Sequence, residues 1–202
     1  DWPLSAAISD TFAARLASAL DGCDAVVLSD YGSGLVTPQL AATLHDALTK
    51  TRRATVPVLL DSRYRLLDYR GLATCTPNES EVEHALGITI GDNPEALELA
   101  GRTLLKKTRS QAVLITRGSR GMALFEPRRA TVHVPIFGSD EVADVTGAGD
   151  TVIATFALSL AAGASFYEAA RLANFAGGLV VMKRGTATVS AAELSEAVQS
   201  GV

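Results

Sequence analysis

Hydrophobic residues near the start of the chain recur at intervals of three and four, which is the spacing of one face of a helix. They are Ile8, Phe12, Leu16 and Leu20. This spacing predicts an amphipathic helix over residues 5–20. The pattern then changes to short continuous apolar runs at residues 25–28 and 56–60, which are typical of buried strands.

Helices and strands alternate through the middle of the chain. A cap residue followed by proline occurs at residues 37–38 and 93–94, and predicts helices that run to about residues 50 and 108. Short strands are expected at residues 73–76 and 112–116, and a helix follows the first of them, to about residue 86. The repeated strand-helix-strand order favours a parallel sheet with helices on both faces.

The C-terminal half begins with a predicted hairpin and ends in helices. A glycine turn at residues 117–121 joins the strand before it to residues 122–125, and residues 131–134 are expected to form an edge strand. Three helices follow, the first starting at about residue 149. Capping boxes fix the starts of the other two, with the pairs Ser165 and Glu168, and Ser190 and Glu193.

Composition limits the classes of protein that fit. With 202 residues, 48% of them hydrophobic, the chain can bury a full core as one α/β domain, residues 1–202. A net charge of −4 without a basic run argues against nucleic acid as a partner. No apolar stretch reaches membrane-spanning length and the N-terminus lacks a signal-peptide plan, so we expect a cytoplasmic protein. Cys23 and Cys75 are expected to be buried and unpaired.

A glycine loop near residue 147 is the strongest chemical signal. It reads Asp144-Val145-Thr146-Gly147-Ala148-Gly149-Asp150, and an apolar run to residue 162 follows it. Such a loop opening a helix exposes backbone N–H groups at the positive end of the helix dipole, which is an anion site suited to phosphate. Asp150 in the first turn would be an ionised acceptor beside that site, able to take a hydroxyl proton during phosphoryl transfer.

This loop has alternative interpretations. Asp150 can instead simply favour a helix start, as acidic residues often do. The dinucleotide-binding fingerprint requires a third glycine where Val152 stands. The P-loop requires Gly-Lys followed by Ser or Thr, which occurs nowhere in the sequence.

The heptapeptide closely resembles the C-terminal signature of the ribokinase, or PfkB, family of sugar kinases. The resemblance extends over nearly the whole chain in the right order, and it implies a ribokinase-like open, mostly parallel sheet flanked by helices on both faces. It also implies an ATP-dependent transfer to a sugar or sugar phosphate. In that reaction Asp150 is the base, and the N–H groups of Gly147, Ala148 and Gly149 hold the transferring oxygens.

Further motifs imply cofactor contacts by the same resemblance. Residues 76–81, Thr-Pro-Asn-Glu-Ser-Glu, are similar to the family's N-x-x-E element, which implies that Asn78 and Glu81 help to hold Mg²⁺ and its waters. The strand and turn at Thr116 and Gly118 resemble the segment that contacts nucleotide phosphates. Asn174 stands where the family has an asparagine beside the nucleotide base.

The family often holds a monovalent cation such as K⁺ beside the glycine loop. The turn at residues 183–186 resembles the family's closing turn, so Asp144, Thr146 and Gly185 are the implied ligands of this cation.

The acceptor side is less completely matched. Within the family, the segments around Asp30 and Arg63 are similar to the kinases of heptose 7-phosphate, and both residues follow predicted strands, where ligands gather in open parallel sheets. We therefore assign Asp30 and Arg63 to the acceptor. The alternative is that these strand-end residues contact neighbouring loops and no substrate. Ser33 replaces a lysine of that pattern and Ser62 a proline, which leaves the acceptor's phosphate less securely recognised.

The chain begins at Asp1 rather than Met, after the N-terminal strands and lid that form the sugar pocket in this family. We therefore expect a donor half without most of the acceptor half. Family dimers often form through the lid, so a homodimer of the complete protein is one expectation. The rival to a kinase is a non-catalytic nucleotide-binding module or a degenerate kinase that serves as an interaction domain. His45, His84 and His133 lack ligand spacing and are expected at the surface.

Overall fold

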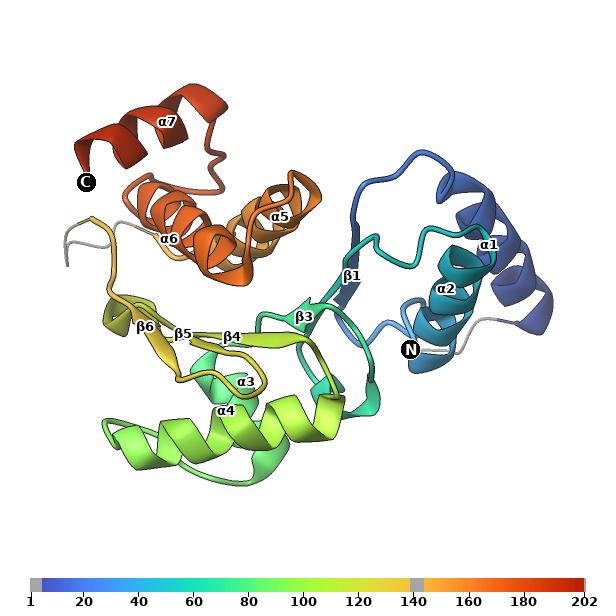
Figure 1. Ribbon diagram of the computed structural model, residues 1–202, viewed down its shortest axis with the longest axis horizontal. Coiled ribbons are helices and arrows are strands. Elements are labelled where there is room, and N and C mark those ends of the chain that lie inside the picture. The colour runs from blue at the N-terminus through green and yellow to red at the C-terminus, as the bar shows by residue number, and fades with distance from the viewer. Residues whose placement is uncertain (1–4, 139–143, 202) are drawn as a thin grey trace.

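A single six-stranded sheet runs through the part of the chain that the structure describes (Figure 1). The structure, a computed structural model, describes residues 5–138 and 144–201. The strands lie side by side in chain order: β1 Val26–Asp30, β2 Val58–Ser62, β3 Thr74–Cys75, β4 Ala112–Thr116, β5 Met122–Phe125 and β6 Val132–Val134. β1 to β4 pair in parallel, and β5 and β6 add antiparallel strands at one edge.

The connections explain why the crossover helices share one face of the sheet. Each parallel strand is added on the same side of the one before it, and parallel crossovers are almost always right-handed, so the connecting helices fall on one face. They are α2 Pro38–Lys50, α3 Glu79–Leu86 and α4 Pro94–Thr108. α1 Ala6–Ala19 precedes β1 and packs against α2 in the same core. Short 3-10 turns, η1 Leu66–Asp68 and η2 Gly118–Arg120, lie in two of the loops.

Alternation along the strands produces two separate cores. Val58 and Leu60 pack with the residues of α2 and α4, whereas Leu59 between them packs with α5 and α6 on the other face. The two cores follow because successive side chains of a strand point to opposite faces. The second face is covered by α5 Ala148–Ala161 and α6 Phe166–Val181, with α7 Ala191–Ser200 packed outside α6.

Small residues in α6 allow the close approach of the segments around it. A Cβ added to Gly178 would lie 2.3 Å from the carbonyl oxygen of Phe137, and one added to Gly177 would lie 3.0 Å from Val152 of α5. The more numerous alanines of α6 are fully buried against α5 and the sheet. α5 is therefore held close to the sheet, with its N-terminus at the end where the parallel strands finish.

The sequence prediction of the fold is confirmed, with small shifts. β1 starts one residue, and β2 two residues, after the start of its predicted run. Both strands continue through polar residues, because Asp30 pairs with Ser62 in the ladder. Both predicted capping boxes of α6 and α7 are present. Ile8 is 56% exposed, because α1 packs through residues nearer its C-terminal end.

The expectation for the two cysteines is confirmed in part. Both are free and Cys75 is buried, which raises the pKa of its thiol to about 12, but Cys23 is only half-buried. The three histidines are exposed. Among residues 5–138 and 144–201, the helices are too short or too polar for a membrane span.

Gly101 offers a test of the packing between α4 and the sheet. A Cβ at this position would lie 2.3 Å from ring atoms of Phe125, which is fully buried. We expect Gly101→Ala to destabilise the protein by about 1–3 kcal/mol, although alanine alone favours a helix over glycine by ~1 kcal/mol. Urea unfolding measures the change. Adding Phe125→Leu should recover part of the loss, and strict additivity of the two variants would contradict this account.

Candidate active site

A cavity of about 730 Å³ opens where the parallel strands end and α5 begins. It is lined by the ends of β1 and β2, the start of α3, the turn after β4, the glycine loop and α6. Every residue singled out in the sequence as a site residue lines this cavity, except Asp144 and Gly185. A second cavity of about 310 Å³ lies at the opposite ends of the strands, between Asp24, Arg53 and Pro57.

The glycine loop presents backbone N–H groups at the start of α5. Gly147 has φ +78° and caps α5, which begins at Ala148, one residue before the predicted start. The Ala148 N–H donates to the Val145 carbonyl at 3.2 Å. Within the described residues no acceptor faces the N–H groups of Gly147, Gly149 and Asp150. These three groups, at the positive end of the α5 dipole, are the available donors.

Asp150 lies exposed in the first turn of α5 and has a partner from the far side of the cavity. The Tyr31 hydroxyl donates to Asp150 Oδ1 at 3.1 Å. Tyr31 was not among the residues selected from the sequence. The only available signal was its position directly after Asp30 at a strand end.

The two residues assigned to the acceptor are placed differently. Asp30 is 3% exposed, and its carboxylate accepts from the Tyr69 hydroxyl at 2.7 Å, the Ser62 hydroxyl at 3.1 Å and the Gly32 N–H at 2.9 Å. Burial, followed by this bond to Asp30, raises the pKa of Tyr69. Arg63 is exposed, with its guanidinium 5.7 Å from the centre of the Tyr31 ring. The Asp30 carboxylate therefore braces the loop that carries Tyr31.

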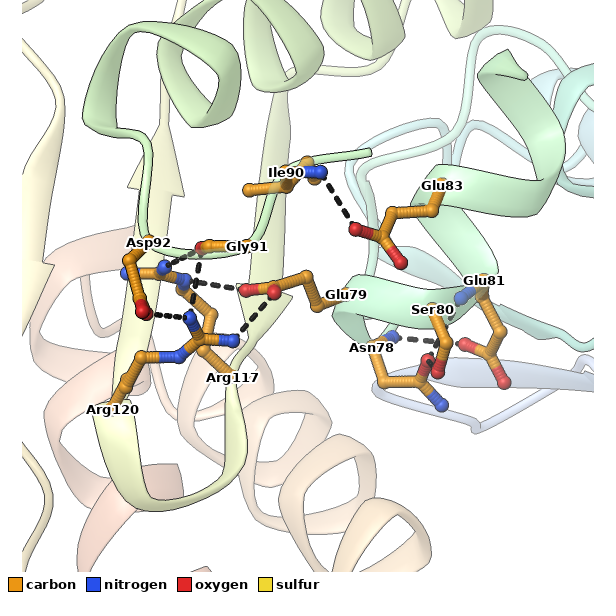
Figure 2. Close-up of polar contacts among 10 residues, drawn as sticks. All are labelled: Asn78, Glu79, Ser80, Glu81, Glu83, Ile90, Gly91, Asp92, Arg117 and Arg120. Carbon is orange, nitrogen blue, oxygen red and sulfur yellow. Dashed lines mark hydrogen bonds and ion pairs between the residues drawn. The ribbon is translucent and has the colours of Figure 1, made fainter. Parts of the chain in front are cut away.

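Asn78 and Glu81 form a capping box at the start of α3 while also lining the cavity (Figure 2). Asn78 Oδ1 accepts from the Glu81 N–H at 2.8 Å and the Ser80 hydroxyl at 2.9 Å, and Glu81 Oε2 accepts from the Asn78 N–H at 2.9 Å. Both lone-pair directions of Asn78 Oδ1 are thus used. The atoms left for a ligand are Asn78 Nδ2 and Glu81 Oε1.

Three of the carboxyl groups that line the cavity, those of Asp61, Glu81 and Asp150, interact through their charges. Burial raises the pKa of Asp61, and the negative charge of Asp150 acts in the same direction. Burial also raises the pKa of Glu81; the Asn78 N–H lowers it, and the charge of Asp61 raises it. The described residues contain no group of three or more His, Cys, Asp or Glu side chains placed to hold a metal by themselves. A cation here would need oxygens from a ligand as well.

Asp144, Thr146 and Gly185 are brought together although they come from two segments. The Asp144 carboxylate accepts from the Thr146 N–H at 2.9 Å and the Gly185 N–H at 3.2 Å. Hydrogen bonds from Thr146, then from Gly185, lower the pKa of Asp144. The loop and the closing turn are therefore joined beside the cavity.

The remaining predicted residues, Asn174, Thr116 and Gly118, also line the cavity. Asn174 is 6% exposed and donates through Nδ2 to the Pro135 carbonyl at 2.8 Å, which supplies the partner expected for a buried amide. The Thr116 N–H donates to the Pro77 carbonyl at 2.9 Å. Gly118 has φ +56°, which favours glycine in this turn.

Comparison with known proteins decides the family. Residues 2–193 match the pfkB family carbohydrate kinases. The chain belongs to this family. The bifunctional protein HldE of Caulobacter vibrioides is 45% identical over 197 residues, which cover 96% of this pfkB chain and 39% of that protein. HldE of Stutzerimonas stutzeri is 46% identical over 184 residues, covering 90% and 37%. The chain thus spans about two-fifths of the length of these curated relatives.

Solved structures confirm the pfkB fold. Ribokinase from Arabidopsis thaliana, complexed with ribose and ATP, superimposes with a TM-score of 0.77 at 24% identity, covering 92% of this chain and 59% of that one. Phosphofructokinase-2 from Escherichia coli, in complex with potassium, gives a TM-score of 0.74 at 18% identity, covering 93% and 61%. The ribokinase-like sheet expected from the sequence is therefore confirmed.

The interaction of Asp61 with Glu81 predicts a measurable change in pKa. Replacing Asp61 with Asn removes a negative charge that raises the pKa of Glu81, so the pKa of Glu81 should fall. Carboxyl NMR titration of the wild type and of Asp61→Asn measures it. Glu98, whose pKa is lowered by Thr131 and Arg102, is an internal control that should not move. An unchanged or raised Glu81 pKa would show that the two groups do not interact.

Proposed function

We propose that this site carries out ATP-dependent phosphoryl transfer to a hydroxyl of a sugar or sugar phosphate. One observation supports it most: a single cavity joins the glycine loop and Asp150 on one side to Asn78 and Glu81 on the other. A helix N-terminus suits a phosphate, and the carboxylates opposite suit the cation that accompanies it. The nucleotide base would lie beside Asn174, and its phosphates beside Thr116 and Gly118.

Asp150 would act as the general base. The acceptor oxygen attacks the γ-phosphorus, the bond to the β-phosphate oxygen breaks to release ADP, and the hydroxyl proton passes to the Asp150 carboxylate. The N–H groups of Gly147 and Gly149 would stabilise charge on the transferring oxygens. The Ala148 N–H, which is bonded to Val145, must leave that bond to join them. The acceptor hydroxyl must displace the Tyr31 hydroxyl from Oδ1 or use Oδ2.

The donor set fits Mg²⁺ bound together with nucleotide phosphates. Mg²⁺ prefers one or two carboxylates together with phosphate oxygens and waters. The capping box uses Glu81 Oε2 and leaves Oε1 for a ligand, and the Asp61 carboxylate lines the same cavity. When bound, the ion neutralises phosphate charge. Asn78 Nδ2 would donate to a phosphate oxygen or to a water. At the neighbouring turn, oxygens of Asp144, Thr146 and Gly185 would hold a large monovalent ion such as K⁺.

The acceptor would bind beside the end of β1. The resemblance to heptose 7-phosphate kinases makes a heptose phosphate the first candidate. Tyr31 and Tyr64 near the end of β1 are 55% and 62% exposed, and Val27 on that strand is 40% exposed. Such exposed apolar surface beside an edge strand is suited to further strands. We infer that chain outside these 202 residues completes the sugar pocket there.

Asp150→Asn separates catalysis from a helix-start role. Asn keeps the size and much of the capping ability, so we expect a stability loss below ~1 kcal/mol. As a lost general base, it should lower kcat by roughly 10²-fold or more while ATP still binds. The measurement is turnover at saturating ATP with the longest protein that the gene encodes and its best sugar substrate.

Glu168→Gln is the matched control for that experiment. Glu168 is also a first-turn carboxylate, at the start of α6, and it does not line the cavity. It should leave kcat unchanged. Retention of most of the wild-type kcat by Asp150→Asn would overturn the mechanism, and absence of turnover in the wild type would favour the non-catalytic nucleotide-binding module.

Asn78 and Asn93 separate a capping role from a ligand role. Both cap helices, of α3 and α4, but only Asn78 lines the cavity. Replacing either with Ala should cost about 1 kcal/mol of stability. Only Asn78→Ala should weaken Mg–ATP binding in calorimetric titration. Equal effects of both variants on binding would show that Asn78 is only a cap.

A further inference from the structure

Two walls of the cavity meet the nucleotide's phosphates under the proposed function, and they come from separate segments. One is the start of α3, with Asn78 and Glu81; the other is the turn after β4, with Gly118 and Ser119. The backbone joins them at one point, where the Thr116 N–H donates to the Pro77 carbonyl at 2.9 Å. Beyond that bond the turn closes the β4–β5 hairpin, with the Arg117 N–H donating to the Gly121 carbonyl at 2.9 Å. Its remaining contacts with the start of α3 are made by side chains.

Glu79 supplies the second connection (Figure 2). Its Oε2 accepts from Arg117 Nε at 2.8 Å and its Oε1 accepts from a terminal nitrogen of Arg120 at 2.5 Å. We call Glu79, Arg117 and Arg120 the Glu79 cluster. Each arginine also donates to the Gly91 carbonyl, at 3.1 and 2.8 Å respectively, and Arg120 bonds the Asp92 carboxylate at 2.5 Å. Three segments are thereby joined: the start of α3, the loop before α4, and the turn.

The Glu79 cluster is set back from the cavity although its neighbours face it. Asn78, Thr116 and Gly118 line the cavity, whereas none of the three cluster residues does. The side chains of Glu79 and Arg117 are 13% and 12% exposed, so this ion pair is largely removed from water. The negative charges of Glu79 and Asp92 balance the positive charges of Arg117 and Arg120. The arginines are therefore committed to protein partners rather than aimed at a ligand.

The chemistry of the cluster requires arginine. Each guanidinium spans from the Glu79 carboxylate to the Gly91 carbonyl, using two nitrogens in a fixed planar fork. A lysine carries the same charge on a single nitrogen and cannot hold both acceptors in this way. The pair of two-point contacts resists both sliding and rotation of the turn.

We propose that the Glu79 cluster is a positioning device of the donor site. It holds the turn with Gly118 and Ser119 at a set distance from Asn78 and Glu81, so that phosphates and their cation bind to groups already in place. This inference rests on the proposed function. Residues that orient direct ligands change affinity without contacting the ligand, and their loss commonly costs 10–100-fold in binding or activity.

Calorimetric titration of this chain with Mg–ATP tests the inference without an acceptor sugar. We expect Glu79→Gln and Arg117→Lys each to raise the Kd by about 10-fold or more, measured well below the melting temperature of each variant. The double variant should be little worse than either single one, because both break the same link. If Glu79→Gln fails to fold, Arg120→Lys replaces it, since that side chain is 39% exposed.

Arg102→Lys is the matched control. Arg102 also makes a fork of contacts, to Glu98 and to the carbonyls of Glu126 and Arg129, but it lies outside the cavity lining. It should lower stability and leave the Kd for Mg–ATP unchanged. An equal Kd for Glu79→Gln and the wild type would overturn the positioning role.

Two other results of the titration would each exclude the positioning role, for different reasons. If Arg117→Lys weakens binding while Glu79→Gln strengthens it, the arginine is a direct phosphate ligand and the positioning role is wrong. If the wild type shows no Mg–ATP binding, the proposed function fails first, and the positioning role fails with it. Hydrogen exchange without nucleotide adds an independent check, because the amides of Gly118 and Ser119 should exchange faster in Glu79→Gln, and unchanged exchange would contradict the inference.

Discussion

The site depends on how closely α5 packs against α6 and the sheet. The right-handed crossovers commit α2, α3 and α4 to one face, where α1 also packs, and α5 and α6 cover the other face. Alanines and glycines along α6 permit the close contact. As a result, the N-terminus of α5 lies at the carboxyl ends of the parallel strands, where open sheets of this kind bind ligands.

Charge is the second constraint on the site. Asp61, Glu81 and Asp150 face a common cavity, and burial together with mutual repulsion raises the pKa of the first two. Under the proposed function, a cation that enters with nucleotide phosphates would offset this repulsion. The phosphates would lie at the N–H groups at the start of α5 that no acceptor faces within the described residues.

Local features of the site could be predicted from the sequence, whereas long-range contacts could not. The glycine loop and the Asn78 to Glu81 element are each contained within a few residues, so their spacing reveals them. The contact between Tyr31 and Asp150 joins residues 119 positions apart, and no periodicity links them. The Glu79 cluster likewise depends on the register that aligns β4 with the start of α3.

The structure shows a further role for some residues that the sequence assigned to a ligand. Asn78 and Glu81 were expected to help to hold Mg²⁺, and the structure shows that they form a capping box while both line the cavity. Their role as ligands stays a prediction. Asp30 was assigned to the acceptor, yet its carboxylate is buried and occupied by three protein donors. Its role as a substrate ligand stays a prediction. Burial and hydrogen-bond saturation are tertiary properties, which residue type alone does not convey.

The central claim is that one metal-bound nucleotide lies between the glycine loop and the start of α3. Paramagnetic broadening of backbone amide signals by Mn²⁺–ATP tests it most directly, because the ion replaces Mg²⁺ and marks its surroundings. We predict selective broadening around Gly149, Glu81 and Gly118, and none around Arg53 in the second cavity, at the opposite ends of the strands. Broadening centred on Arg53, or none at Gly149 and Glu81 under saturating Mn²⁺–ATP, would contradict the account.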